Sequence, residues 1–255
     1  MSCALPGLAD DLKTRFVGKW IVYHERLPST MVAARREVKQ GAREGMVVIA
    51  GEQTEGRGRR RRHWLSPRGN VALSIILYPE ISHLPSLIML ASLAVVRSVS
   101  ALTGLNPRIK WPNDVLIGDR KLCGILAESS VRGDRVDYAI IGIGLNVNLE
   151  PGCFPEIAPL ATSLYHELGR QFSLVEVIRG LLVEVEKLYL SLKDGGPIYE
   201  EWRKLLVTLG QRVQVKWGDT VYEGTAEAVA RDGSLLLRHA DGSTTRAVAG
   251  EVTLH

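Results

Sequence analysis

An arginine-rich segment between residues 53 and 70 carries the most specific chemical pattern in this sequence. Residues 56–62 read Gly-Arg-Gly-Arg-Arg-Arg-Arg. Glycine lets the backbone approach a ligand closely, and its N–H groups can then form an anion-binding nest. Arginine adds planar, permanently charged groups that match carboxylates and phosphates. The segment is typical of a loop that folds over a small phosphate-bearing ligand, and the alternative is a basic run that binds nucleic acid or is simply solvated.

A second string, Lys-Trp-Pro-Asn-Asp at residues 110–114, places a lysine and a carboxylate on either side of a proline. Proline cannot donate to a β-ladder and bends a strand, so Lys110 and Asp114 can point into one cavity. An aspartate near phosphates would hold Mg²⁺, and a lysine would offset phosphate charge. The alternative is a strand, a proline turn and a capping residue without a ligand.

Two further strings contain polar residues at strand ends. Lys121 begins an otherwise apolar strand, where an isolated lysine is usually solvated. Residues 142–148 read Gly-Ile-Gly-Leu-Asn-Val-Asn, in which glycine permits close approach and asparagine offers both a donor and an acceptor. No helix is expected after this string, so it is not a dinucleotide-binding fingerprint.

Composition narrows the class of protein. The 255 residues are 45% apolar and 24% charged, which is ordinary globular usage, and the net charge is +4. Five arginines against two glutamates between Glu52 and Arg62 give a local charge of +3, which favours a site over a generally cationic surface. Three cysteines without metal-ligand spacing favour a reduced, cytoplasmic setting. Serines and Arg97 interrupt the apolar stretch 84–102, so we expect a buried helix there and no membrane association.

Hydrophobic periodicity predicts an α+β fold. Because the strands between residues 108 and 148 have short connections, we expect them to be antiparallel neighbours. The expected helices cover residues 9–20, 31–42, 84–104, 174–192 and 197–208. The expected strands cover residues 20–26, 46–50, 71–77, 108–111, 114–117, 121–129 and 136–148.

The texture of the sequence changes after residue 208. Short alternating strands are expected at 212–217, 221–230, 234–239 and 244–248, separated by Gly-Asp and Asp-Gly turns. This pattern predicts a small β-barrel or meander. We therefore expect two domains, residues 1–208 and residues 209–255.

Taken in order, these strings resemble those of the biotin protein ligases, the biotin–[acetyl-CoA-carboxylase] ligases. The resemblance is strong over about residues 20–150, and the small β-domain at the end agrees with it. One position departs from it. The family loop usually reads Gly-Arg-Gly-Arg-x-Gly-Arg, and Arg61 stands where its later glycine is expected. If that glycine needs a positive φ, either Arg61 is strained or the loop takes another path.

The resemblance implies a two-step acyl transfer. Biotin and ATP would form biotinyl-5′-AMP, and a lysine of a biotin carboxyl carrier protein would then attack it. The implied fold resembles the catalytic core of class II aminoacyl-tRNA synthetases, followed by an SH3-like barrel. Too few residues precede the first strand for the N-terminal DNA-binding module of related bifunctional members, so specific DNA binding is not expected. A homodimer is compatible with the resemblance.

The resemblance also implies roles for individual residues. Biotin would be bound by Ser29, Thr30, Gln53, Gly56, Arg57, Lys121 and Gly124. The nucleotide would be bound by Arg59, Arg60, Arg62, Trp64, Lys110, Asn113 and Asn146. Catalysis would fall to Arg59, Lys121 and Asp114, with Asp114 also managing Mg²⁺.

Two other function classes stay open on the sequence. A lipoate–protein ligase shares the implied fold, but the Gly-Arg-Gly-Arg loop and the Lys-Trp-Pro-Asn-Asp string match the biotin branch. A nucleic-acid-binding module could use the arginine run and the small barrel. The arginine run lacks the interleaved aromatic residues of a base-stacking platform, which disfavours that alternative.

Overall fold

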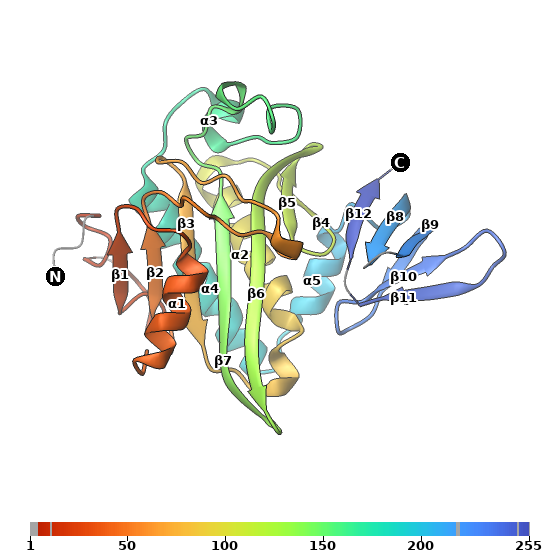
Figure 1. The fold of residues 1–255 in the computed structure, drawn as a ribbon, viewed down its shortest axis with the longest axis horizontal. Helices are drawn as coiled ribbons and strands as arrows, with labels where there is room; N and C mark the ends of the chain where they lie inside the picture. Colours follow the sequence, from red (N-terminus) through yellow and green to blue (C-terminus); the bar gives the residue numbers. More distant parts are fainter. Residues whose placement is uncertain (1–4, 11, 218–219, 249, 255) are drawn as a thin grey trace.

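A seven-stranded mixed sheet forms the centre of the computed structural model, which describes residues 5–10, 12–217, 220–248 and 250–254 (Figure 1). Its strand order is β1-β2-β3-β7-β6-β5-β4. β1 and β2 are parallel, and all other neighbours are antiparallel. This confirms the antiparallel arrangement predicted for the strands between residues 108 and 148. The strands are β1 (Ile21–His24), β2 (Val47–Ala50), β3 (Val71–Leu77), β4 (Arg108–Lys110), β5 (Asp114–Ile117), β6 (Arg120–Arg132) and β7 (Arg135–Leu145).

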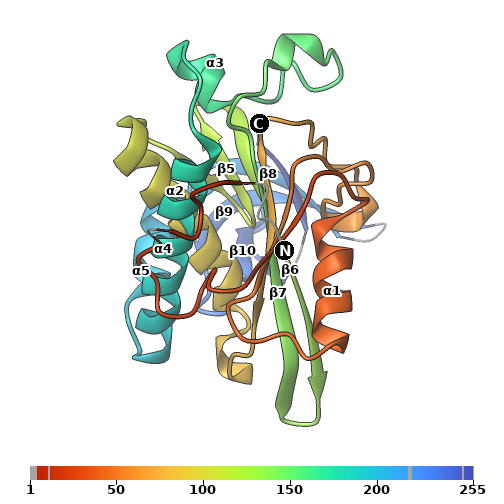
Figure 2. The same cartoon turned by 90° about the vertical axis from the view of Figure 1, so that its left-hand side faces the viewer.

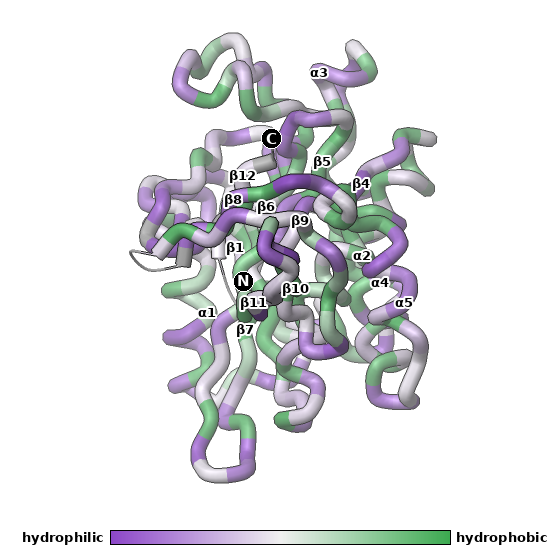
Figure 3. The backbone as a smooth tube through the Cα atoms, turned by 90° about the vertical axis from the view of Figure 1, so that its right-hand side faces the viewer, coloured by the Kyte–Doolittle hydropathy of each residue, from purple (hydrophilic) through white to green (hydrophobic). Residues whose placement is uncertain are grey.

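Helices cover the two faces of this sheet unequally, as Figure 2 shows. On one face lie α2 (Ser86–Thr103), α4 (Leu174–Lys193) and α5 (Ile198–Leu205), while α1 (Thr30–Lys39) lies on the other. The main core is therefore the layer between the sheet and the helices α2, α4 and α5. In Figure 3 the hydrophobic colour follows the strands of the central sheet and α2.

The apolar helix expected at 84–104 is confirmed as α2. By length and composition alone it could cross a membrane, but 61% of it is buried inside the protein. It packs against α4 and α5, and Gly104 ends it with a left-handed φ of 75°. The structure therefore identifies α2 as a core helix.

The helix expected at 9–20 is wrong. The described residues of this segment form turns and bends, and residue 11 lies outside the described residues. The carboxylate of Glu186 on α4 explains the difference, because it accepts the backbone N–H groups of Arg15, Phe16 and Val17 at 2.6, 2.8 and 2.9 Å. These donors are then not available for i→i−4 bonds, so the apolar residues pack from an irregular chain.

A second sheet follows the helices, and its five antiparallel strands have the order β11-β10-β9-β8-β12. The first four strands were expected, whereas the last was not, because it is short and ends the sequence. The strands are β8 (Arg212–Trp217), β9 (Thr220–Val229), β10 (Leu235–Arg238), β11 (Thr244–Ala247) and β12 (Glu251–Leu254).

Trp111, just after β4, joins the two sheets. Its side chain is 2% exposed, and its indole N–H donates to the Gly233 carbonyl at 2.7 Å. Its backbone N–H donates to the Thr208 hydroxyl oxygen at 2.9 Å. The chain that links the helices to the second sheet is thus hydrogen-bonded to the strand end that carries residues 110–114.

Candidate active site

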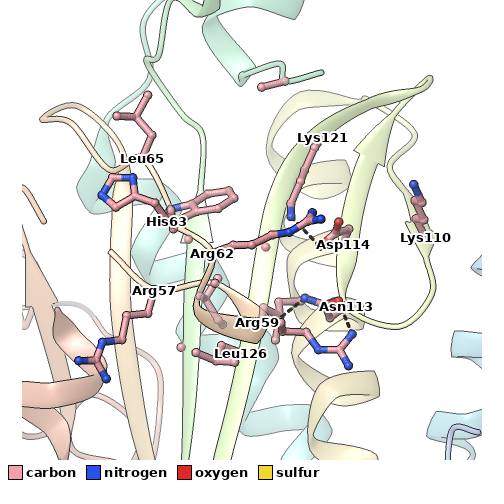
Figure 4. A pocket seen from close by; sticks show the side chains of 18 of the residues that line it. Arg57, Arg59, Arg62, His63, Leu65, Lys110, Asn113, Asp114, Lys121 and Leu126 are labelled. Carbon is pink, nitrogen blue, oxygen red and sulfur yellow. Dashed lines mark hydrogen bonds and ion pairs between the residues drawn. The ribbon is translucent and has the colours of Figure 1, made fainter. Parts of the chain in front are cut away.

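A cavity of about 470 Å³ lies under the arginine-rich loop, and Figure 4 shows it from close by. It is bounded by the start of α1, by the central strands β6 and β7, and by a segment of the second sheet. The structure brings almost all the sequence-predicted residues to this one place. The lining includes Ser29, Thr30, Gln53, Arg57, Arg59, Arg60, Arg62, Trp64, Lys110, Asn113, Asp114, Lys121, Gly124 and Asn146.

Gly56 is the predicted residue that the cavity lining does not include. Its carbonyl accepts the backbone N–H of Trp64 at 2.8 Å, which closes the base of the loop. A side chain is excluded there, because an added Cβ would lie 2.2 Å from the Trp64 carbonyl oxygen. The glycine therefore serves the backbone of the loop.

A polar network forms the α1 end of the cavity. Thr30 donates its backbone N–H and its hydroxyl to Gln53 Oε1, at 2.8 and 3.1 Å. Ser74 of β3 donates to the Thr30 hydroxyl at 2.8 Å. Ser29 is buried, and its hydroxyl has no partner within the described residues. An orphan hydroxyl that lines a cavity is expected to bond a polar ligand there.

The backbone of the loop passes through the left-handed region at Arg60, where φ is 55° and ψ is 36°. Arg61, at the position of the family's glycine, has no positive φ, so the first of the two alternatives, a strained Arg61, is excluded. Arg60 lies within a 3₁₀ turn over Arg59–Arg61, and the Gly58 N–H bonds the Arg62 carbonyl at 2.8 Å. The loop therefore takes another path, and its strain falls on Arg60.

Lys121 pairs with Asp114 in the middle of the cavity, with 2.8 Å between Nζ and Oδ1. The β5–β6 pairing aligns Lys121 with Leu116, two residues from Asp114, so the Lys121 and Asp114 side chains stand on one face of the sheet. Lys121 Nζ also lies 5.3 Å from the centroid of the Trp64 ring. The lysine is thus held by specific contacts, and the solvated alternative is wrong. Figure 4 shows Arg62 reaching toward this pair.

The Arg59 side chain forms hydrogen bonds where the cavity meets the second sheet. Its Nη1 donates to Asn113 Oδ1 at 3.2 Å and to the Gly250 carbonyl at 3.0 Å. Asn113 is itself fixed, because its Nδ2 donates to the Ile125 carbonyl at 2.8 Å. Lys110 stands apart from the Lys121–Asp114 pair, although it lines the cavity (Figure 4).

Two facing glycines make the floor of the cavity. Gly124 of β6 is paired with Gly144 of β7, and the indole of Trp64 lies over both. An added Cβ would lie 2.4 Å from Trp64 Nε1 at position 144 and 3.0 Å from Cζ3 at position 124. The glycines are needed because a bare strip of sheet admits the aromatic ring.

Among the residues that the structure describes, the site has no reactive thiol and no preformed metal cluster. Burial raises the pKa of the Cys123 thiol far above its ordinary value, so this neighbour of the site stays neutral. Across the described ranges, no three His, Cys, Asp or Glu side chains are grouped to hold a metal ion. A metal at Asp114 would need most of its ligands from elsewhere.

The sequence reasoning missed three residues of the second sheet, Gly250, Val252 and Thr253, which line the cavity. It also missed Met31 on α1. None of these residues belongs to a sequence motif that indicates a binding site. The three residues of the second sheet could have been identified only from the contact between the two sheets.

Fold and site together define an α+β ligand-binding core with an arginine loop over a cationic cavity. Residues 23–146 match the Biotin/lipoate A/B protein ligase family, and residues 208–254 match the Biotin protein ligase C terminal domain. The chain belongs to the biotin protein ligase family.

Individual relatives agree with this membership. The chain is 38% identical over 237 residues to the bifunctional ligase/repressor BirA of Bacillus subtilis, covering 91% of this chain and 73% of that protein. It is 33% identical over 204 residues to the biotin–[acetyl-CoA-carboxylase] ligase of Paracoccus denitrificans, covering 75% and 83%. The biotin protein ligase from Aquifex aeolicus in complex with biotin and ATP superimposes with a TM-score of 0.79 at 27% identity, covering 93% and 99%.

Proposed function

We propose that the protein is an ATP-dependent biotin ligase that makes biotinyl-5′-AMP and then biotinylates one lysine of a biotin carboxyl carrier domain. The main support for this proposal is one continuous cavity, which is lined by the polar network at Thr30 and Gln53 and by the Lys121–Asp114 pair beneath the arginine loop. One end suits a neutral polar ring, and the middle suits an anion. A lipoate-specific enzyme is not favoured, because the matched C-terminal domain and the relatives are those of biotin ligases.

In the first step, a biotin carboxylate oxygen would attack the α-phosphorus of ATP, and pyrophosphate would leave. Both reactants are anions, so their approach is costly without nearby cations. Lys121 and Arg62 lie where they can offset this charge, and Arg59 can close over the product. In the second step, the neutral amine of the carrier lysine would attack the acyl carbon, AMP would leave, and the amine would lose a proton.

Mg²⁺ fits the site as an ion that arrives with ATP. It prefers one or two carboxylates together with phosphates and water, and Asp114 offers one carboxylate beside the proposed phosphate position. The ion would neutralise part of the phosphate charge. Lys121 would at the same time hold the Asp114 carboxylate in place.

The roles of the other residues follow their places in the cavity. The unpartnered Ser29 hydroxyl and the Thr30–Gln53 network support biotin recognition at the α1 end. The proposed biotin contacts are Ser29, Thr30, Gln53, Gly56, Arg57, Lys121 and Gly124. The proposed nucleotide contacts are Arg59, Arg60, Arg62, Trp64, Lys110, Asn113 and Asn146.

The finer description of the fold also belongs to this proposal. Residues 1–208 would form a core like that of class II aminoacyl-tRNA synthetases, and residues 209–255 an SH3-like barrel. The five-stranded antiparallel sheet supports the second assignment. β1 at the edge of the large sheet is compatible with a homodimer. Two free cysteines, Cys123 and Cys153, support a reducing cytoplasmic location.

The test is incubation with biotin, ATP, Mg²⁺ and a biotin carboxyl carrier domain, followed by intact mass. We expect the mass of one biotinyl group to be added to the carrier, and lipoate to add nothing. Lys121→Ala should lower pyrophosphate release by about 10²–10³-fold, as loss of one charge stabiliser does. Lys187→Ala, on the exposed side of α4, is the matched control and should behave like the wild type. Pyrophosphate release by Lys121→Ala within a few-fold of the wild type would refute the role of this lysine.

A further inference from the structure

The backbone of Lys121 is hydrogen-bonded to residues 160–162. Its N–H donates to the Leu160 carbonyl at 2.8 Å, and its carbonyl accepts the Thr162 N–H at 2.9 Å. Lys121 and Ala161 therefore form an isolated parallel bridge outside the sheet. The position of the lysine at the start of β6 depends on where residues 160–162 lie.

Thr162 also fixes a second residue of the site. Its carbonyl accepts the side-chain amide of Asn146 at 2.9 Å, and the same amide lies 3.4 Å from the Lys121 carbonyl. Thr162 is fully buried, so its hydroxyl needs a partner within the protein. That partner is Glu167, whose Oε1 accepts the hydroxyl at 2.5 Å.

The Glu167 carboxylate also bonds the neighbour of Lys121 in the chain. The same Oε1 accepts Nη2 of Arg120, the residue that precedes Lys121, at 2.8 Å. The Glu167 side chain is only 16% exposed, whereas Arg120 is 39% exposed. An exposed ion pair contributes little to stability, but a mostly buried carboxylate with two donors fixes the geometry of both.

Glu167 lies on the short helix α3 (Leu164–Leu168), and the chain around it is well anchored. Ser163 caps this helix by accepting the His166 N–H at 2.9 Å, and its hydroxyl donates to the Leu149 carbonyl at 2.5 Å. Nε2 of His166 lies 2.8 Å from Nη1 of Arg120. The carboxylate is therefore presented to Arg120 and Thr162 from a fixed position.

We propose that Glu167 is a positioning residue for adenylate formation, acting on Lys121 through Arg120 and Thr162. The inference rests on the proposed function, in which Lys121 stabilises the charge at the acyl-phosphate junction. Glu167 itself touches no reacting atom. A displacement of Lys121 by about 1 Å is enough to cost on the order of 10²-fold in rate.

The test compares Glu167→Ala and Glu167→Gln with the wild type in single-turnover adenylate formation. Glu167→Ala should lower the maximal rate by about 10–10²-fold, because geometry at the reacting centre is lost. The apparent affinity for biotin should fall much less than the rate, since Thr30 and Gln53, two other proposed biotin contacts, are held by other elements. Glu167→Gln keeps an acceptor for Thr162 and should recover part of the rate. Glu156→Gln, exposed on the same segment, is the matched control and should have no effect.

A double-mutant cycle separates positioning from general stability. If Glu167 acts through Lys121, Glu167→Ala should cause no further loss of rate in a Lys121→Ala background. An equal loss in both backgrounds would overturn the inference. So would a rate loss in Glu167→Ala that is matched by a parallel fall in biotin affinity and in Tm.

The same experiment distinguishes the two proposals. A wild-type chain that makes biotinyl adenylate supports the proposed function, and the cycle then decides the role of Glu167 alone. A wild-type chain that makes no adenylate with biotin, ATP and Mg²⁺ would overturn both.

Discussion

Replacing Arg60 by glycine should stabilise the hydrogen-bonded conformation of the arginine loop described above, here called its closed form, relative to an open loop without those bonds. Replacing Arg61 by glycine should destabilise the closed form. The two substitutions are matched, because each removes one arginine and introduces the same residue one position apart. They differ in the backbone, since Arg60 has a φ of 55° and Arg61 has no positive φ. The sequence pattern alone would have placed the beneficial glycine at position 61.

The size of the effect follows from two opposing terms. A non-glycine residue in the left-handed region costs about 1–2 kcal/mol, and glycine removes this cost at position 60. Glycine also adds conformational freedom to the open loop, which costs about 0.5–1 kcal/mol at either position. We therefore expect Arg60→Gly to favour the closed loop by about 0.5–1 kcal/mol, or 2–5-fold, and Arg61→Gly to disfavour it by a similar factor.

Amide hydrogen exchange without ligands measures this balance directly. The reporters are the N–H groups of Gly58, Arg62 and Trp64, which are all hydrogen-bonded within the loop. Their exchange should slow in Arg60→Gly and quicken in Arg61→Gly. The opposite order would show that the strain lies at position 61, and equal exchange in both variants would show that backbone strain does not control the loop.

Two further predictions concern retention of the intermediate and stability of the fold. Arg59→Gly removes the hydrogen bonds to Asn113 and Gly250 and should speed release of biotinyl adenylate by about 10-fold or more. The released adenylate should then biotinylate bystander lysines. Labelling confined to the carrier lysine, with an unchanged release rate, would contradict this prediction. Glu186→Gln leaves one of three backbone N–H groups without an acceptor and should lower the free energy of unfolding in urea by about 2–3 kcal/mol. Glu176→Gln, exposed at the start of the same helix, should cost less than about 1 kcal/mol, and equal losses would argue against the role of Glu186.

Periodicity and turn chemistry predicted most of the fold. The helices expected at 174–192 and 84–104 are confirmed as α4 and α2; the Ser173 hydroxyl caps α4 by accepting the Glu176 N–H, and Gly104 ends α2. These features depend on residues close in sequence. The prediction of an N-terminal helix was wrong because the backbone N–H groups there donate to the carboxylate of Glu186, some 170 residues away in sequence. No local pattern contains that information.

The candidate site was predictable in part for the same reason. Strings such as 110–114 and 121–126 contain unusual residue types, and the β5–β6 pairing brings them together. What those side chains contact was not predictable. Asn146 bonds the carbonyl of Thr162, and Arg59 bonds a carbonyl of the second sheet, which are contacts set by tertiary packing. Glu167 carries no pattern at all and stands out only through its two partners.

The joint at Trp111 gives the cavity a property that neither sheet has alone. Residues 110–114 of the large sheet and Gly250, Val252 and Thr253 at the second sheet line the cavity together, and Arg59 bonds both Asn113 and Gly250. Slippage between the sheets would therefore alter the width of the cavity before any strand unfolds. Heat or mild denaturant should therefore lower activity by loosening the contact between the two sheets before either sheet unfolds, and the thermal durability of the enzyme should depend on that contact.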